Sequence, residues 1–145
     1  MDDFEDFMTP EEIQLVKTSF DKLAAMPDQV GEMFYQRLFE LDPNARQLFW
    51  GNMREQGKAL FLMLDMVVNS LDIQDKIVPI IFDLGKRHAM YGVRDRHYQP
   101  FEQAMMDTLS NVVGSDFTPD VRKAWSAAFA FLADIMKEAS ARPAK

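Results

Sequence analysis

Apolar residues recur at helical spacing along almost the whole chain, whereas alternating strand patterns are weak. Intervals of three, four and seven residues place such side chains on one face of a helix. The amphipathic stretches are separated by short breaks, with no internal repeat and no low-complexity linker. The pattern therefore predicts an all-α fold of about seven amphipathic helices that share one core.

The clearest helix start is Thr9-Pro10-Glu11-Glu12. Thr9 can cap the helix, proline suits the first helical position, and Glu12 completes a capping box. This first helix is expected to run to about Ala25. The same signal returns in Thr118-Pro119-Asp120, which predicts the start of the last helix.

Between these two starts the apolar pattern predicts further helices. Pro27 opens the second, and Asp42-Pro43 starts a short third by the same capping logic. Phe49-Trp50-Gly51 is expected in a turn. A helix over residues 54–71 and a connection over residues 72–76 follow.

The next helix is expected from residue 77 to residue 91, with Gly92 as its end. Pro79 is then confined to the first turn of that helix or to the residue before it. A further helix is expected over residues 96–113, with Gly114 as its stop.

Length and composition favour one soluble cytoplasmic domain. The chain has 145 residues, a net charge of −7 and no cysteine. Its acidic start lacks the features of a signal peptide, and no stretch is apolar enough to span a bilayer. We expect a flexible segment over residues 1–8, one domain over 9–140 and a frayed tail over 141–145.

Most site chemistries are excluded by the residues present. Without cysteine there is no thiolate metal site, iron–sulfur cluster or cysteine nucleophile. Two histidines cannot form a three-histidine zinc site, and there is no glycine-rich phosphate loop or nucleophile elbow. The negative charge opposes nonspecific binding to nucleic acid. A self-contained hydrolase or transferase is therefore a poor fit.

His88 is the residue that needs an explanation. It follows Leu84 by four residues and Ile81 by seven, so it shares their apolar helix face, and Lys86 and Arg87 flank that face. A buried imidazole needs hydrogen-bond partners or a ligand. Two readings remain open on this helix alone: a core histidine held by ordinary hydrogen bonds, or an axial ligand to a haem iron.

Several stretches together resemble the globin family, most closely single-domain bacterial globins and the haem domain of flavohaemoglobins. They are VGEMFYQRLFELDPNARQLF, REQGKALF, LGKRHAMYGV with RHY, and FTPDVRKAW. The resemblance covers about residues 9 to 139, in order and with similar spacing. It implies a three-on-three helical sandwich around haem b.

The resemblance also implies roles for individual residues. His88 matches the proximal histidine that is bonded to the iron, and Phe49 matches the phenylalanine that packs on the haem. Gln56 matches the distal polar position, and Leu60 matches the apolar residue above the iron. Tyr35 matches the distal tyrosine of the second helix.

Further residues complete the implied haem site. Tyr98 matches the tyrosine that, in flavohaemoglobins, hydrogen-bonds near the iron-bound histidine. Leu84, Arg87 and Val93 belong to the expected cofactor-binding set around His88. Oxygen and other gases are expected to contact Tyr35, Gln56 and Leu60.

One departure concerns the last helix. Flavohaemoglobins place a glutamate there that polarises the proximal histidine. An ungapped count from Trp125 puts Ser140 at that position, and Glu138 lies two residues away. A strong electronic effect of such a glutamate is therefore not expected here.

The resemblance implies a protein that reversibly binds dioxygen, as well as nitric oxide and carbon monoxide, at a five-coordinate ferrous iron. Oxygen transport is one use of such binding, in a bacterial setting, by a monomer or a weak homodimer. One alternative is nitric oxide dioxygenation, with electrons from a separate reductase. The others are a gas sensor that acts through a partner protein, and a haem-free helical interaction module.

Overall fold

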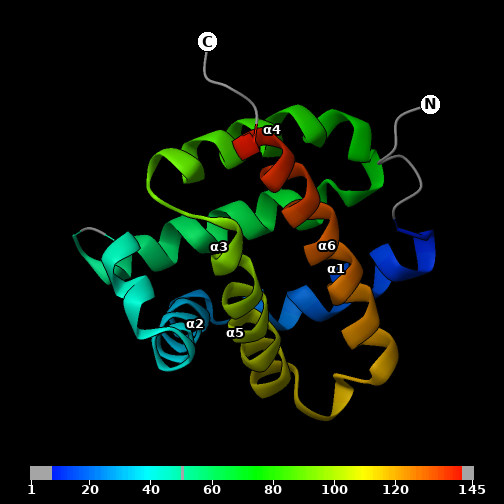
Figure 1. Cartoon of the computed structure of the whole chain (residues 1–145). Helices are drawn as coiled ribbons and strands as arrows, with labels where there is room; N and C mark the ends of the chain where they lie inside the picture. Colours follow the sequence, from blue (N-terminus) through cyan, green and yellow to red (C-terminus); the bar gives the residue numbers. More distant parts are fainter. Residues whose placement is uncertain (1–7, 50, 142–145) are drawn as a thin grey trace.

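The structure, a computed structural model, describes residues 8–49 and 51–141, apart from the side chain of residue 74 (Figure 1). Within this part of the chain there are six α-helices, three short 3₁₀ helices and no strand. They are α1 (Pro10–Ala24), α2 (Pro27–Leu41), η1 (Pro43–Leu48), α3 (Met53–Asn69), η2 (Leu71–Ile73), α4 (Gln74–Met90), α5 (Asp95–Val113), η3 (Gly114–Asp116) and α6 (Pro119–Ala141). The prediction of an all-α fold is confirmed.

The predicted caps of the first and last helices are present. The Thr9 hydroxyl accepts from the Glu12 N–H at 3.1 Å, and the Glu12 carboxylate accepts from the Thr9 N–H at 3.0 Å. At the start of α6 the Thr118 hydroxyl accepts from the Val121 N–H at 3.3 Å. These bonds satisfy N–H groups that the first turn of a helix leaves without a partner.

The predicted ends of α4 and α5 are also confirmed. Gly92 follows α4 with φ of 101°, and Gly114 follows α5 with φ of 68°. A side chain is strained at such positive φ values, so glycine is the residue that allows the chain to leave each helix there.

The predicted short helix after Asp42 begins at Pro43, but it is the 3₁₀ helix η1, and the predicted cap is wrong because the Asp42 side chain makes no capping hydrogen bond. The predicted start of α4 is also wrong. α4 begins at Gln74 rather than at residue 77, so Pro79 lies inside the helix. Its ring is exposed, and the helix continues to Met90 although proline has no N–H to donate to the preceding turn.

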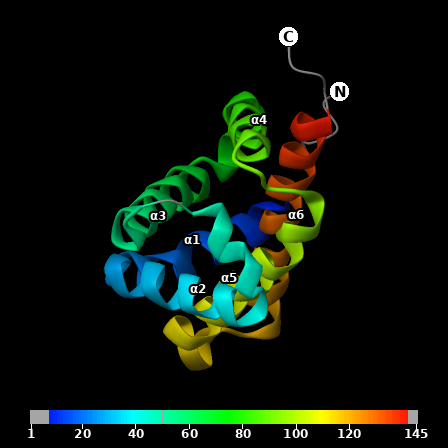
Figure 2. The same cartoon turned by 60° about the vertical axis from the view of Figure 1, so that its left-hand side comes forward.

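The helices pack in pairs that cross one another. α4 lies against the C-terminal part of α6, as both views show, and α2 lies against α3 and α5 (Figures 1 and 2). α1 packs on the other part of α6. The core between them contains Trp125 and Phe131, both fully buried.

Two of these pairs meet backbone to backbone through glycine. A Cβ atom on Gly31 of α2 would lie 2.9 Å from the Cα of Gly57 in α3. A Cβ atom on Gly85 of α4 would lie 2.6 Å from the Cα of Met136 in α6. Because there is no room for a methyl group on Gly31 or on Gly85, the two contacts set the separation of the helices.

The predicted terminal segments fall mostly outside the described residues. This applies to residues 1–7 and 142–145, and also to Trp50 in the predicted turn. Met8, at the edge of the described part, is buried against the core.

Candidate functional site

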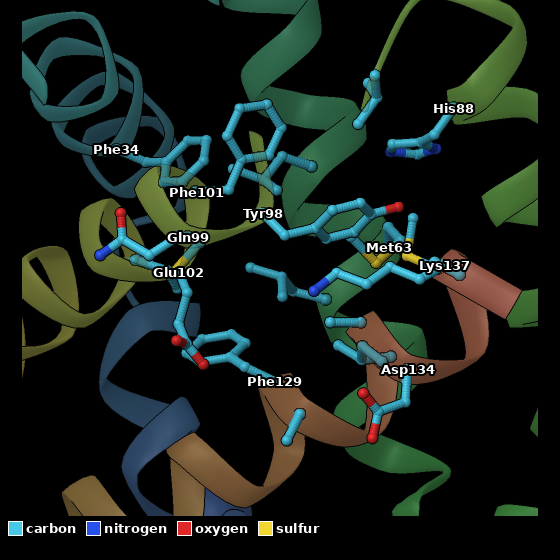
Figure 3. Close-up of a pocket in the computed structure, with 18 of the residues that line it drawn as sticks. Phe34, Met63, His88, Tyr98, Gln99, Phe101, Glu102, Phe129, Asp134 and Lys137 are labelled. Carbon is cyan, nitrogen blue, oxygen red and sulfur yellow. The ribbon is translucent and has the colours of Figure 1, made fainter. Parts of the chain in front are cut away.

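A cavity of about 400 Å³ is lined mainly by residues of α5 and α6, and residues of α2, α3 and α4 complete its walls. This volume is within the range of small-molecule and cofactor sites. Most lining side chains are apolar, and Figure 3 shows them converging from several helices. The apolar lining includes Phe34, Phe49, Leu60, Met63, Leu64, Val93, Phe101, Met105, Phe129, Leu132 and Met136.

His88 projects into this cavity from the last turn of α4 (Figure 3). Its Nδ1 lies 2.8 Å from the carbonyl oxygen of Leu84, one turn earlier. A carbonyl can only accept a hydrogen bond, so Nδ1 is the protonated nitrogen and Nε2 carries the lone pair.

The charge state of His88 follows from its surroundings. Burial lowers the pKa of His88 below its ordinary value, and the positive charge of Arg87 adds to this effect. The hydrogen bond to the Leu84 carbonyl acts in the opposite direction. At neutral pH the imidazole is therefore uncharged, which is the form that binds a metal ion.

The donor set and the shape of the walls fit a haem group. A neutral imidazole with its lone pair on Nε2 is an axial ligand for haem iron, and flat apolar side chains suit the face of an aromatic macrocycle. Among the described residues there is no group of three or more His, Cys, Asp or Glu side chains that could hold a bare metal ion.

Tyr35, Phe49 and Leu60 form another part of the cavity wall. The Tyr35 hydroxyl donates to the carbonyl oxygen of Gln56 at 3.3 Å. Burial raises the pKa of Tyr35 to about 12, so this hydroxyl keeps its proton at neutral pH. The Phe49 ring meets the Tyr35 ring edge-on, with 5.0 Å between the centroids. This wall therefore offers one buried O–H donor among aromatic and aliphatic groups.

Three residues of the expected cofactor set do not line the cavity. Gln56 is half-buried one turn before Leu60, and its backbone carbonyl is the atom that meets Tyr35. Leu84 contributes through its carbonyl. Arg87 is directed along its own helix, where Nε lies 3.3 Å from the Asp83 carboxylate.

The side of the cavity near His88 also holds Tyr98 and Val93, both from the expected set. Burial, and after it the negative charge of Asp95, raises the pKa of Tyr98 to about 12. The ammonium group of Lys137 lies 5.3 Å from the centre of the Tyr98 ring, a cation–π distance. Lys137 of α6 thus places its ammonium group on the Tyr98 ring, and its side chain forms part of the cavity wall.

The two residues considered for the glutamate position of the last helix lie elsewhere. The Ser140 hydroxyl donates to the Lys137 carbonyl of its own helix at 2.8 Å. Glu138 is exposed and is not a lining residue.

Sequence reasoning missed several lining residues. The apolar ones occupy buried stripes of α5 and α6, and helical spacing places them in the core without showing which of them face a cavity. The charged ones were missed because Glu102, Asp134 and Lys137 flank these stripes and are expected in solvent.

No helix in residues 8–49 and 51–141 is long and apolar enough to cross a membrane.

Two flavohemoproteins of similar sequence are longer than this chain. A flavohemoprotein of Vibrio cholerae is 25% identical over 131 residues, which are 88% of this chain and 33% of that protein. A flavohemoprotein of Bacillus subtilis is 25% identical over 127 residues, which are 84% of this chain and 31% of that protein. The chain thus spans about a third of the length of these relatives.

Solved structures of similar fold match almost the whole chain. One is an engineered carbene transferase, described as a putative nitric oxide dioxygenase from Rhodothermus marinus. It has a TM-score of 0.82 and 27% identity, over 92% of this chain and 94% of that chain. A bacterial globin from Campylobacter jejuni has a TM-score of 0.78 and 22% identity, over 91% and 96% of the two chains.

The sequence model of the globin family matches residues 32–136, which contain α3, α4 and α5 and the greater part of α2 and α6. Together with the all-α architecture, this match establishes that the chain belongs to the globin family.

Proposed function

We propose that this protein binds haem b in the cavity that His88 lines, with His88 as the ligand to the iron, and that it reversibly binds dioxygen and other diatomic gases. One observation carries the proposal: a neutral imidazole, with Nδ1 held by the Leu84 carbonyl, directs its lone pair into an apolar cavity. The haem would supply a ferrous iron at which a gas ligand binds.

The residues of the cavity have distinct parts in this proposal. Leu84 holds the His88 ring in one tautomer and orientation through its carbonyl. Phe49 and Leu60 exclude water from the part of the cavity that Tyr35 lines, which strengthens polar interactions there. Tyr35 is the buried donor that would hydrogen-bond a gas ligand, and Gln56 is the second candidate donor. An amide is a weak iron ligand beside imidazole, so the position opposite His88 stays open to gas.

A second candidate activity is nitric oxide dioxygenation, which converts nitric oxide to nitrate. It is favoured by the similarity to the putative nitric oxide dioxygenase from Rhodothermus marinus and to the flavohemoproteins. This reaction leaves ferric haem, so each cycle needs one electron. We propose that a separate reductase supplies it.

The experiment that tests haem binding is the absorption spectrum of the purified protein, recorded as isolated, after dithionite and then under carbon monoxide. A Soret band that sharpens and shifts with carbon monoxide is expected for a five-coordinate ferrous haem. No haem uptake, even after reconstitution, would overturn the proposal and return His88 to the role of a core residue. A six-coordinate low-spin ferrous spectrum would overturn the open site.

The axial ligand is tested with a matched pair of histidine variants. His88→Ala is expected to lose most of its haem affinity, whereas His97→Gln retains it, because His97 does not line the cavity. A His88→Ala protein that purifies with full haem would contradict the assignment. Oxygen dissociation rates and nitric oxide consumption, measured with an added reductant, then separate gas binding from dioxygenation.

A further inference from the structure

Two large side chains at the end of α4 are unusually exposed. Met90, the last residue of α4, is 83% exposed, and Tyr91, which follows it, is 66% exposed. Met90 follows Lys86 by one turn, and Tyr91 follows Arg87 by one turn. The exposed apolar pair therefore continues the face on which two cations lie.

The same surface carries positive charge in an acidic protein. Residues 83–97 contain four cationic side chains and two carboxylates, in a chain of net charge −7. We call this region the α4-end surface. Its members are Lys86, Arg87, Met90, Tyr91, Arg94 and Arg96.

Most of the positive charge is not neutralised locally. Among these four cations, Arg87 forms an ion pair with a carboxylate, that of Asp83, and the other three form none with a carboxylate of the described residues. Arg94 donates to the carbonyls of Ala89 and Val93, at 3.1 and 3.2 Å. Lys86 lies over a phenylalanine ring of its own helix. Arg96 lines a polar hollow that is also lined by Asp42, a carboxylate from another part of the fold.

The α4-end surface is directly connected to His88. The N–H groups of Tyr91 and Val93 both donate to the His88 carbonyl oxygen, at 3.1 and 3.0 Å. Covalent bonds and hydrogen bonds thus lead from the exposed turn to the histidine that lines the cavity. The surface is on the outside of the same helix end.

We propose that the α4-end surface is where an electron-donor protein docks, and that this donor is a one-electron redox protein whose cofactor edge is surrounded by carboxylates. The inference rests on the proposed haem site. One electron leaves the donor, which is oxidised, and reduces ferric haem iron to the ferrous state. No atom is transferred.

The chemistry of the surface fits such a partner. An apolar centre with a charged rim is the usual anatomy of a protein interface, and aromatic residues and methionine are enriched in its core. An acidic donor is repelled by the net charge of −7 at long range. At physiological ionic strength charges are screened beyond about 8 Å, so the local cations decide the final approach.

The test uses the haem-loaded ferric protein and three reductants: photoreduced FMN, which is anionic, photoreduced lumiflavin, which is neutral, and reduced flavodoxin as an acidic protein donor. Reduction of the haem is followed by transient absorption at several ionic strengths. The variant is the double substitution Lys86→Glu and Met90→Glu. The matched control is Leu62→Glu on α3, where a residue of similar exposure, 67%, lies away from the α4-end surface.

For the wild type we expect the rates with FMN and flavodoxin to fall as salt is added, despite the negative net charge. The double variant should lose on the order of tenfold in its flavodoxin rate at low salt and reverse the salt dependence. Its lumiflavin rate and its carbon monoxide spectrum should be unchanged, and Leu62→Glu should behave as the wild type.

Three outcomes would overturn the inference. One is an unchanged flavodoxin rate in the double variant, and another is an equal loss in Leu62→Glu. The third is a wild-type dimer in sedimentation that Met90→Glu dissociates, which would make a second copy of this chain the partner. Failure of the wild type to bind haem would contradict the proposed function instead, so the two failures are distinguishable.

Discussion

The hydroxyl of Tyr35 donates to the backbone carbonyl of Gln56 across 3.3 Å, which joins α2 to α3 beside the cavity. This distance lies beyond the usual O–H···O range of 2.5–3.0 Å, so the bond is weak. A buried hydroxyl with a weak partner can turn toward a stronger acceptor at small cost. We expect it to do so when a gas ligand is present.

Replacement of Tyr35 by phenylalanine tests this expectation. A hydrogen bond to a charged acceptor contributes about 1.5–3 kcal/mol, and its loss should speed oxygen dissociation by roughly 10- to 100-fold. Faster autoxidation is expected as well. Stopped-flow measurement of the off-rate checks the prediction, with Tyr91→Phe as the control because Tyr91 is exposed. An unchanged off-rate in Tyr35→Phe would mean that the hydroxyl stays on the Gln56 carbonyl.

Gly85→Ala is expected to lower the stability of the protein. The new methyl group would lie 2.6 Å from the Cα of Met136, so α4 and α6 must separate. Overpacking of this kind costs about 1–3 kcal/mol, which outweighs the gain of up to about 1 kcal/mol in helix propensity. Urea unfolding measures the difference.

Gly57→Ala is the matched control for Gly85→Ala. Its methyl group would lie 3.4 Å from the nearest atom, the Cα of Gly31, so we expect a nearly neutral effect. Equal stability of the two alanine variants would contradict the inferred contact between α4 and α6. Because Gly85 lies one turn before His88, weaker haem retention in Gly85→Ala is also expected.

His97→Gln should make stability less dependent on pH. The His97 Nδ1 accepts from the Arg94 N–H at 2.8 Å, which requires a neutral ring. Burial lowers the pKa of His97, and the charges of Arg96 and Arg94 add to this while Asp42 opposes it. As the pH falls below about 6.5, His97 is protonated in the unfolded chain but stays neutral in the folded state. The folded state therefore loses stability relative to the unfolded chain.

Glutamine at the same position can accept this backbone bond without titrating, as in a capping box. We expect His97→Gln to unfold at a similar urea concentration to the wild type at pH 7.5, and to lose less stability by pH 5.5. The difference should be on the order of 1 kcal/mol per pH unit. Parallel pH profiles for the two proteins would show that His97 does not contribute.

Ser19→Ala removes the acceptor of a buried indole. The Trp125 Nε1 donates to the Ser19 hydroxyl at 2.8 Å, and that hydroxyl donates to the Leu15 carbonyl at 2.7 Å. The unpaired indole N–H should cost about 1–3 kcal/mol. The melting temperatures of samples with equal haem content check this, and Ser126→Ala on the exposed side of α6 is the control. A melting temperature equal to that of the control would mean that the indole finds another acceptor.

The parts of the fold that sequence predicts well are those that depend on local chemistry. The Thr9 cap needs only residues 9–12, and the glycine ends of α4 and α5 need only one residue each. The face of His88 follows from its spacing to Ile81 and Leu84, since a helix has a fixed period. None of these depends on which other helix lies nearby.

The parts that sequence predicts poorly depend on contacts between distant residues. Pro79 is read as a helix start because proline disfavours the interior, but an exposed site tolerates the loss of one bond. The contact of Arg87 with the cofactor stays a prediction, and in the structure the Arg87 Nε lies 3.3 Å from the Asp83 carboxylate of the same helix. Nothing in the sequence around Lys137 indicates that its side chain lines the cavity and that its ammonium group lies on the Tyr98 ring of another helix.

The two glycine contacts have a consequence for how the cavity moves. α3 is held to α2 at Gly31 and Gly57, and α4 is held to α6 at Gly85 and Met136, in each case at the level of the backbone. Residues of both pairs line the cavity, together with residues of α5. Its thermal fluctuations should therefore be relative displacements of one pair against the other, with each pair shifting as a rigid body. A gas molecule would then enter where the α2–α3 pair meets the α4–α6 pair, and its rate of entry would depend on how often the two pairs move apart.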